Sequence, residues 1–237
     1  MIVWAGTRSD EVGMIVEHYP RVVLPQRKFE TQTVPGRNGD IVLSEGAFQN
    51  YDQEYQVFLD SKYAGGLETA MPRIVDWLLG HDGYQRLEDS YFPDFYRMAR
   101  FDGGTQFFSF FNEYGEGTLT FSCAPEKFYR SGEKPVALTT SGTKLRNPSG
   151  FKALPLFKVN GSGYGKLYVD SNYIEISNIT NGFVMIDVKT HQAYNGTTNR
   201  SNTITGDFDN LKLGPQSSIS WSNGVTSVEV TPRWWTI

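Results

Sequence analysis

Two turn signals in close succession constrain the fold of this chain more than any other feature. Residues 34–40 contain a Pro-Gly pair and an Asn-Gly pair and lie between two β-rich runs. Pro35 pre-sets the first central φ of a turn, Gly36 supplies the positive φ of a type II turn, and Asn38-Gly39 favours a tight hairpin. We therefore expect a rigid, exposed loop with Arg37 at its tip. Taken alone, such a loop is more often a plain connection than a binding site.

Most of the chain has the periodicity of β-strands. In residues 118–123, apolar side chains at every second position alternate with hydroxyl residues, which predicts a strand buried on one face. The exception is a helix predicted near residues 70–79, where Met71, Ile74, Val75 and Leu78 fall at helical spacing. Pro72 suits the first turn of this helix, and Gly80 suits its end. One short amphipathic helix should therefore pack on the first sheet.

A shift in composition divides the chain. With 237 residues it is long enough for two ordinary domains, and residues 131–150 are rich in Ser, Thr, Gly and Pro. We therefore assign residues 1–130 to one domain and residues 131–237 to another. Short strands at regular turn spacing predict a β-sandwich in the second domain. The expected strands are 156–159, 165–169, 173–176, 183–188, 204–219 with a loop inside, and 227–231.

A glycine-rich stretch in the second domain could be mistaken for a phosphate-binding loop. Residues 160–165 read Asn-Gly-Ser-Gly-Tyr-Gly, but a strand is predicted directly after them. A dinucleotide-binding fingerprint must instead open a helix. We therefore expect a hairpin turn between two strands here.

Several function classes are disfavoured. The net charge is −4 with no basic block, which argues against specific nucleic-acid binding. The single cysteine, Cys123, excludes an intrachain disulfide and should be a small buried hydrophobe, while His18, His81 and His191 lack metal-ligand spacing. The acids of Glu88-Asp89 and of Asp207 with Asp209 are typical of solvated loops and turns, and no nucleophile motif is present. We expect no enzyme, cofactor or metal site.

No membrane association is expected either. The chain contains no apolar run long enough to span a membrane, and its first residues lack the pattern of a signal peptide. We therefore expect a protein that is made and kept in the cytoplasm.

Segments along almost the whole chain resemble the distal tail protein family of bacteriophages with long, non-contractile tails. Their order and spacing carry the resemblance, since each alone is weakly specific. One departure is Asn38, where an acidic residue is more usual in the family. The segments are the 34–39 loop, residues 51–59, Trp77-Leu78-Leu79-Gly80, Leu87-Glu88-Asp89-Ser90-Tyr91, residues 96–101, residues 119–128, Asn147-Pro148, Ala153-Leu154-Pro155-Leu156, Gly161-Ser162-Gly163, Met185-Ile186-Asp187 and Pro232-Arg233-Trp234.

The resemblance implies a structural role in the virion tail. It implies a mainly β protein, with an N-terminal β domain that carries one helix and forms a ring, and a C-terminal galectin-like β-sandwich. The family forms a homo-hexamer between the major tail tube protein and a tail-associated hub or fibre protein, with the tape measure protein as a further candidate partner, and DNA passes through the ring. A closed ring requires two different patches of one protomer to meet on neighbours. The candidate patch is the loop of Pro35, Gly36, Arg37, Asn38 and Gly39.

Two alternatives stay open. The chain could be a carbohydrate-binding adhesion module, if Trp221, Trp234 and Trp235 present their rings to sugars rather than cap the core. It could also belong to a phage-derived particle with the same ring chemistry. The aromatic runs 91–96 and 107–111 contain more large apolar groups than one strand face needs, which indicates either a subunit interface or a second packed layer.

Overall fold

The computed structural model describes residues 1–60, 67–105, 107–110 and 114–237 of the chain. It is mainly β, as the sequence predicts. The chain forms two compact units, one of Met1–Lys127 with Ile237 and one of Phe128–Thr236. Strand β10 (Tyr114–Tyr129) crosses the point where the first unit ends and the second begins. Within the described residues, no helix is long and apolar enough to span a membrane.

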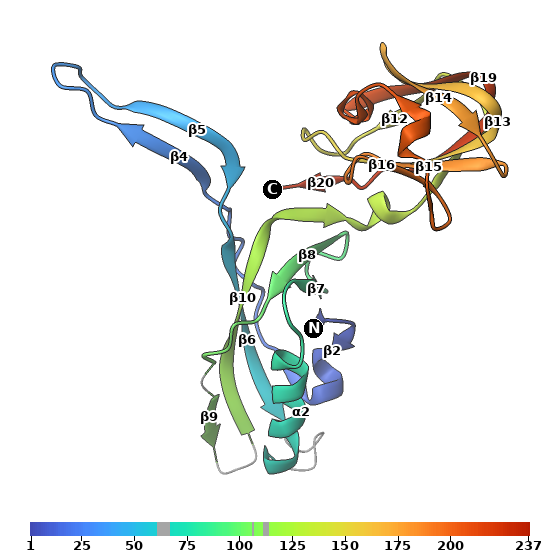
Figure 1. Cartoon of the computed structure of the whole chain (residues 1–237). Coiled ribbons are helices and arrows are strands. Elements are labelled where there is room, and N and C mark those ends of the chain that lie inside the picture. The colour runs from blue at the N-terminus through green and yellow to red at the C-terminus, as the bar shows by residue number, and fades with distance from the viewer. Residues whose placement is uncertain (61–66, 106, 111–113) are drawn as a thin grey trace. The chain divides into compact units, whose positions relative to one another are not determined.

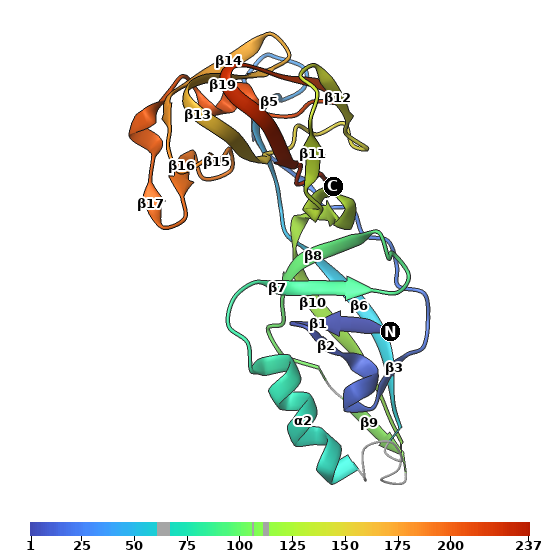
Figure 2. The same cartoon turned by 90° about the vertical axis from the view of Figure 1, so that its right-hand side faces the viewer.

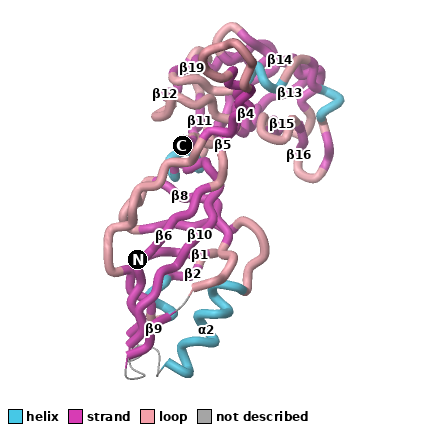
Figure 3. Tube along the Cα trace, turned by 90° about the vertical axis from the view of Figure 1, so that its left-hand side faces the viewer, coloured by secondary structure: helices cyan, strands magenta, loops and turns pink. Residues whose placement is uncertain are grey.

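The first unit is built on a curled sheet with the strand order β2-β1-β7-β8-β10-β6-β3, and β9 and β20 (Trp235–Thr236) also pair with β10. Figure 3 shows β6, β8 and β10 of this sheet. Leu119, Phe121 and Cys123 of β10 are fully buried, which confirms the alternation read from the sequence. The elements that form this sheet and pack on it are β1 (Ile2–Trp4), β2 (Thr7–Arg8), the 3-10 helix η1 (Ser9–Val12), β3 (Met14–Val16), β6 (Tyr51–Asp60), α2 (Leu67–Leu79), β7 (Gln85–Asp89), β8 (Phe95–Arg100), β9 (Phe107–Phe110) and β10.

Helix α2 covers one face of this sheet, which confirms the predicted helix. Its buried residues are Ala70, Ile74, Trp77 and Leu78, and the indole nitrogen of Trp77 donates to the carbonyl of Trp4 at 3.3 Å. Two details of the prediction are wrong. Val75 is exposed, because the large Trp77 turns the buried stripe toward its own side. Pro72 lies in the helix interior rather than in the first turn.

Gly80 ends α2, as predicted, and a close backbone approach requires a glycine there. Its N–H donates to the carbonyl of Asp76 at 2.9 Å. A Cβ at position 80 would lie 2.3 Å from the same carbonyl oxygen, so any other residue would force the chain apart.

The second unit is a β-sandwich whose two layers share their long strands (Figure 2). The first part of β13 pairs with β15, its last part pairs with β14, and β19 runs beside both parts. The elements of the second unit are η2 (Arg130–Glu133), β11 (Val136–Leu138), β12 (Thr143–Arg146), β13 (Leu156–Val169), β14 (Asn172–Ile179), β15 (Phe183–Asp187), β16 (Gln192–Asn195), β17 (Thr198–Asn199), η3 (Ser201–Thr203), β18 (Ile204–Thr205), η4 (Phe208–Leu211), β19 (Gln216–Thr231) and β20 (Trp235–Thr236).

The glycine-rich stretch 160–165 is not the predicted hairpin turn. It lies inside β13, where the register with β19 shifts and the strand passes from one layer to the other. Glycine is required because the two backbones nearly touch: a Cβ on Gly161 would lie 2.1 Å from the carbonyl oxygen of Gly224. The predicted strands 156–159 and 165–169 are thus two arms of one bent strand. The predicted strand 204–219 with a loop inside is confirmed, since β18 and the start of β19 form its two ends and η4 lies between them.

Candidate functional site

A two-stranded hairpin in the first unit contributes nothing to the core. Strands β4 (Arg27–Gln32) and β5 (Ile41–Phe48) pair only with each other (Figure 1). Every residue of β4 is exposed, and in β5 only Ile41 and Phe48 are half-buried. We call residues 27–48 the arm. Since an isolated two-stranded hairpin is marginally stable in water, the arm lacks the stabilisation that a packed face normally provides.

Both faces of the arm carry apolar side chains. Cross-strand partners lie on the same face of a sheet, so Thr31 and Val42 share one face with Phe29, while Glu30 and Leu43 share the other. Phe29, Val42 and Leu43 are all exposed. A solvated hairpin would normally present polar groups on both faces, so the arm has more exposed apolar surface than a plain connection needs.

The loop at the tip of the arm contains the predicted turn but not the predicted tight hairpin. Gly36 has a φ of +82°, and the N–H of Arg37 donates to the carbonyl of Val34 at 3.1 Å, as a type II turn requires. The connection spans residues 33–40, because strand pairing stops at Gln32 and Ile41. Proline cannot donate to a strand ladder, and Asn38 lacks the positive φ that a two-residue type I′ turn needs.

The tip loop is closed by its own side chains and leaves Arg37 available. The hydroxyl of Thr33 donates to Asp40 Oδ1 at 2.8 Å. The guanidinium of Arg37 is exposed and has no ion-pair partner among the residues that the structure describes. A free guanidinium on an ordered turn can bind a carboxylate at two points, so Arg37 is suited to a contact with another chain.

Aromatic packing fixes the segment that leads into the arm. The ring of Tyr19 lies edge-on to Tyr91 at 4.8 Å and to Phe92 at 5.6 Å between centroids, and its hydroxyl donates to the Tyr91 carbonyl. The amide of Gln53 donates to the carbonyl of Arg21 at 3.0 Å. The segment that precedes the arm is therefore fixed by contacts with the sheet of the first unit.

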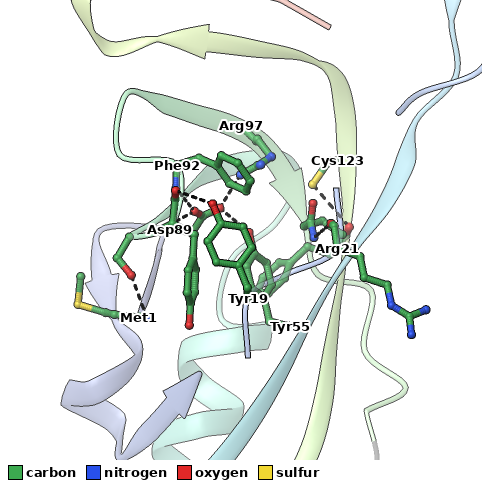
Figure 4. A network of polar contacts seen from close by, with 12 residues as sticks. Met1, Tyr19, Arg21, Tyr55, Asp89, Phe92, Arg97 and Cys123 are labelled. Carbon is green, nitrogen blue, oxygen red and sulfur yellow. Dashed lines mark hydrogen bonds and ion pairs between the residues drawn. The ribbon is translucent and has the colours of Figure 1, made fainter. Parts of the chain in front are cut away.

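Beneath this segment lies a buried polar network centred on Asp89 (Figure 4). Its Oδ2 accepts from Arg97 Nη1 at 2.7 Å and from the Tyr55 hydroxyl at 3.0 Å. Its Oδ1 accepts the backbone N–H groups of Tyr91 and Phe92 at 3.0 and 2.7 Å. Four donors thus satisfy a fully buried carboxylate, which positions the two rings that hold Tyr19.

The expectation that the acids of Glu88-Asp89 are solvated is wrong for Asp89. In β7 the residues on the buried face alternate with those outside, and Leu87 and Asp89 both face inward. The same alternation in β8 directs Arg97 inward, where its Nε donates to the hydroxyl of Tyr51 at 3.1 Å. Burial raises the pKa of Tyr51 to about 12, so this hydroxyl stays protonated. Strand periodicity combined with opposite charges could have identified this pair from the sequence.

The described residues contain no obvious chemical centre. They include no group of three or more His, Cys, Asp or Glu side chains that could hold a metal ion. Burial raises the pKa of the Cys123 thiol to about 12, so it is not a nucleophile near neutral pH. His191 Nε2 lies 3.1 Å from Asp209 on an exposed surface, and the hydrogen bond from Lys212 lowers the pKa of Asp209.

The aromatic candidates divide into three groups. Tyr91, Phe92, Phe95 and Tyr96 are half-buried, and Tyr96 lies under the Arg86 guanidinium at 3.8 Å. The side chains of residues 107–111 lie outside the described residues. Among the three tryptophans of the second unit, Trp234 is buried, while Trp221 and Trp235 are partly buried against the core. All three pack against the core of the sandwich, as tryptophans that cap the core would.

Known structures include proteins with a similar fold, although no match was found at the level of sequence. No protein-family model matches the chain, and no curated protein sequence matches it. Among solved structures, the Dit protein of phage SPP1, described as a paradigm of the hub adsorption apparatus in phages that infect Gram-positive bacteria, matches with a TM-score of 0.77 and 15% identity. The match covers 100% of this chain and 98% of that one. The phage P2 baseplate in its activated conformation, solved with calcium and with strontium, matches at TM-scores of 0.45 and 0.43 with 10% and 11% identity, over 90% of this chain and 88% and 89% of those chains. The chain thus has the fold of the SPP1 hub protein.

Proposed function

We propose that this chain is a distal tail protein, a structural component of a phage virion that forms the hub of the tail tip. Two observations support the proposal. The fold matches a phage hub protein over the entire chain, and the two faces of the arm expose Phe29, Val42 and Leu43. A chain that acts by assembly rather than by turnover needs such an unsatisfied surface and no reactive centre.

Six copies form a closed ring in this proposal. Each protomer offers two different patches, and the arm with its tip loop is one of them. Phe29, Val42 and Leu43 become buried on the neighbouring protomer, while Arg37 binds a carboxylate or a carbonyl group there. The turn of Pro35 and Gly36, with Asn38 and Gly39, holds Arg37 in place. An arm clamped on both faces would acquire the packed layers that a two-stranded sheet lacks.

The ring joins two parts of the tail. One face meets the major tail tube protein, and the other meets a tail-associated hub or fibre protein, with the tape measure protein as a further neighbour during assembly in the host cytoplasm. DNA passes through the opening of the ring. The net charge of −4 suits this conduit, because walls of like charge do not retain DNA. Catalysis and cofactors have no part in this function.

Removing the arm provides the direct test. The arm can be replaced by a short glycine linker, because the N–H of Gln49 donates to the carbonyl of Gln26 at 2.8 Å and the two ends already meet. We expect the full chain to assemble and the armless variant to stay monomeric with an unchanged melting temperature, as measured by light scattering and circular dichroism. An armless variant that assembles like the full chain would refute the proposed contact.

A further inference from the structure

The outer face of the β13–β14 hairpin in the second unit carries an ordered cluster of aromatic and charged side chains. Tyr168 and Tyr173 are cross-strand partners with ring centroids 5.5 Å apart. In the adjacent pair, Lys166 Nζ lies 2.6 Å from Glu175 Oε1 and 4.8 Å from the centroid of the Tyr173 ring. The Tyr173 ring is thus held in place by two neighbours, and the residue remains 46% exposed.

Tyr173 and Glu175 form one wall of an open pocket of about 440 Å³. This volume lies within the range of roughly 300–1,000 Å³ that is common for small-molecule sites. The remaining walls come from Ser171, Asn172, Thr205 and Asn210. The pocket lies entirely within the second unit. It shares no residue with the arm, so what it binds is independent of the proposed ring.

The polar groups of the pocket are available to a ligand. Among the described residues, the side chains of Ser171, Asn172, Thr205 and Asn210 make no hydrogen bond to protein. Two hydroxyls and two carboxamides provide both donors and acceptors. The charge of Glu175 is balanced by Lys166, and the hydrogen bond from Lys166 lowers the pKa of Glu175. The site therefore offers many hydrogen bonds without an excess of either charge.

The walls are preorganised by the core beneath them. Gly206 has a φ of +123°, and a Cβ there would lie 3.2 Å from Ile174 Cγ2, so only glycine lets this loop approach β14 so closely. Asn210 belongs to η4, whose neighbouring Leu211 is fully buried and whose first turn is capped by the Asp207 carboxylate. Less conformational entropy is lost on binding when the walls are already fixed.

We propose that this pocket binds a pyranose unit of a neutral saccharide. The sugar stacks the apolar C–H side of its ring on Tyr173, and its hydroxyls bind Asn172, Thr205 and Asn210. An anionic ligand such as a phosphate would need a free cation, whereas Lys166 is committed to Glu175. A purely apolar ligand would leave the hydroxyls and carboxamides without partners at a considerable cost. A ligand with one apolar face and a rim of hydroxyls satisfies both requirements.

The test is a microarray of neutral oligosaccharides built from hexoses, deoxyhexoses and N-acetylhexosamines, probed with the full chain. Saccharides that bind are then titrated by saturation-transfer difference NMR against three variants. Tyr173→Ala should weaken binding about tenfold or more, whereas Tyr173→Phe should preserve it, because the ring provides the stacking surface. Tyr84→Ala is the matched control, since Tyr84 is 43% exposed but lies in the first unit, and it should bind like the unmodified chain.

The melting curve of each variant shows whether its fold is intact. If Tyr173→Ala is unfolded, the double variant Asn172→Ala with Asn210→Ala replaces it, because both side chains lack protein partners. Its affinity should also fall about tenfold. The proposal is overturned if no neutral saccharide on the array is retained, or if a retained saccharide binds the folded pocket variant as tightly as it binds the unmodified chain.

Discussion

Arg233 and Asp187 form a two-point ion pair, with Nη1 2.7 Å from Oδ1 and Nη2 3.0 Å from Oδ2. It joins the end of β15 to the segment that follows β19. Asp187 also accepts the backbone N–H groups of Lys189 and Thr190, and Arg233 has an unusual φ of +56°. The ion pair thus connects two segments of the second unit that are far apart in sequence, and it stabilises the unfavourable backbone conformation of Arg233.

Replacing Asp187 by Asn should destabilise the second unit in a pH-dependent way. Burial alone would raise the pKa of Asp187, but the Arg233 guanidinium and two backbone N–H groups hold it below its ordinary value. Since the folded pKa is depressed, the stabilisation is complete above the unfolded pKa of about 3.9 and is lost as pH falls through the folded pKa. We expect a loss of about 2 kcal/mol at pH 7, measured by urea unfolding. The gap between variant and unmodified chain should narrow as the pH falls below the unfolded pKa and toward the lower folded pKa, and a gap that does not change with pH would contradict the assignment.

Replacing Arg97 by Met should destabilise the first unit by about 3–5 kcal/mol, because it leaves the buried Asp89 without its charged partner. The same change at Arg8, whose ion pair with Asp10 is exposed, should have no measurable effect. Urea unfolding measures both. Limited proteolysis should also cut Arg97→Met faster between Tyr19 and the arm, since the rings that fix Tyr19 depend on Asp89. If Arg97→Met and the Arg8 variant had the same free energy of unfolding, the polar network around Asp89 would not be what anchors the arm.

Two valine substitutions test whether the apolar faces of the arm are buried in the ring. Val42→Ser in β5 should raise the protein concentration at which half of the chains are assembled by about tenfold. Burial of a valine side chain contributes on the order of 1.5 kcal/mol to the free energy of association. Val136→Ser in β11 is the control, because both valines are strand residues and are 61% and 37% exposed. Sedimentation velocity over a concentration series measures the change. An equal shift for both variants would indicate a general loss of stability instead of a lost contact.

Replacing Arg37 by Ala should raise the protein concentration needed for ring assembly by about tenfold without unfolding the protomer. The side chain is exposed and forms no ion pair with any described residue, so its loss costs the isolated chain nothing. Lys28→Ala, which removes a different exposed cation of the arm, is the matched comparison. Mass photometry at low concentration gives the fraction of assembled protein. Unchanged assembly of Arg37→Ala would remove the tip loop from the interface.

Local signals in the sequence were sufficient for some elements. The apolar spacing around Ile74 predicts α2, alternation predicts the buried side of β10 around Phe121, and Pro35-Gly36 predicts the turn at the tip of the arm. In each case neighbouring residues determine the conformation. The resemblance to distal tail proteins is confirmed at the level of the fold by the match to the SPP1 hub protein.

Other features depend on residues far apart in the chain. The sequence around Gly161 favours a turn, because only the approach of Gly224 shows why a strand needs glycines there. The sequence around Asp89 favours a loop acid, because its partner Arg97 and the two tyrosines lie on other strands. The pocket beside Tyr173 depends on Thr205 and Asn210, more than thirty residues further along, so no local pattern marks it. The exposure of the arm likewise depends on the sheet topology, since none of the described strands outside β4 and β5 pairs with it.

The most direct test is the mass of the purified chain in solution by light scattering, with negative-stain images of the same peak. A hexameric ring should give a mass six times that of the 26.8 kDa chain and an open ring in the images. A monomer over the whole accessible concentration range, also when mixed with the tail tube and hub proteins, would contradict it.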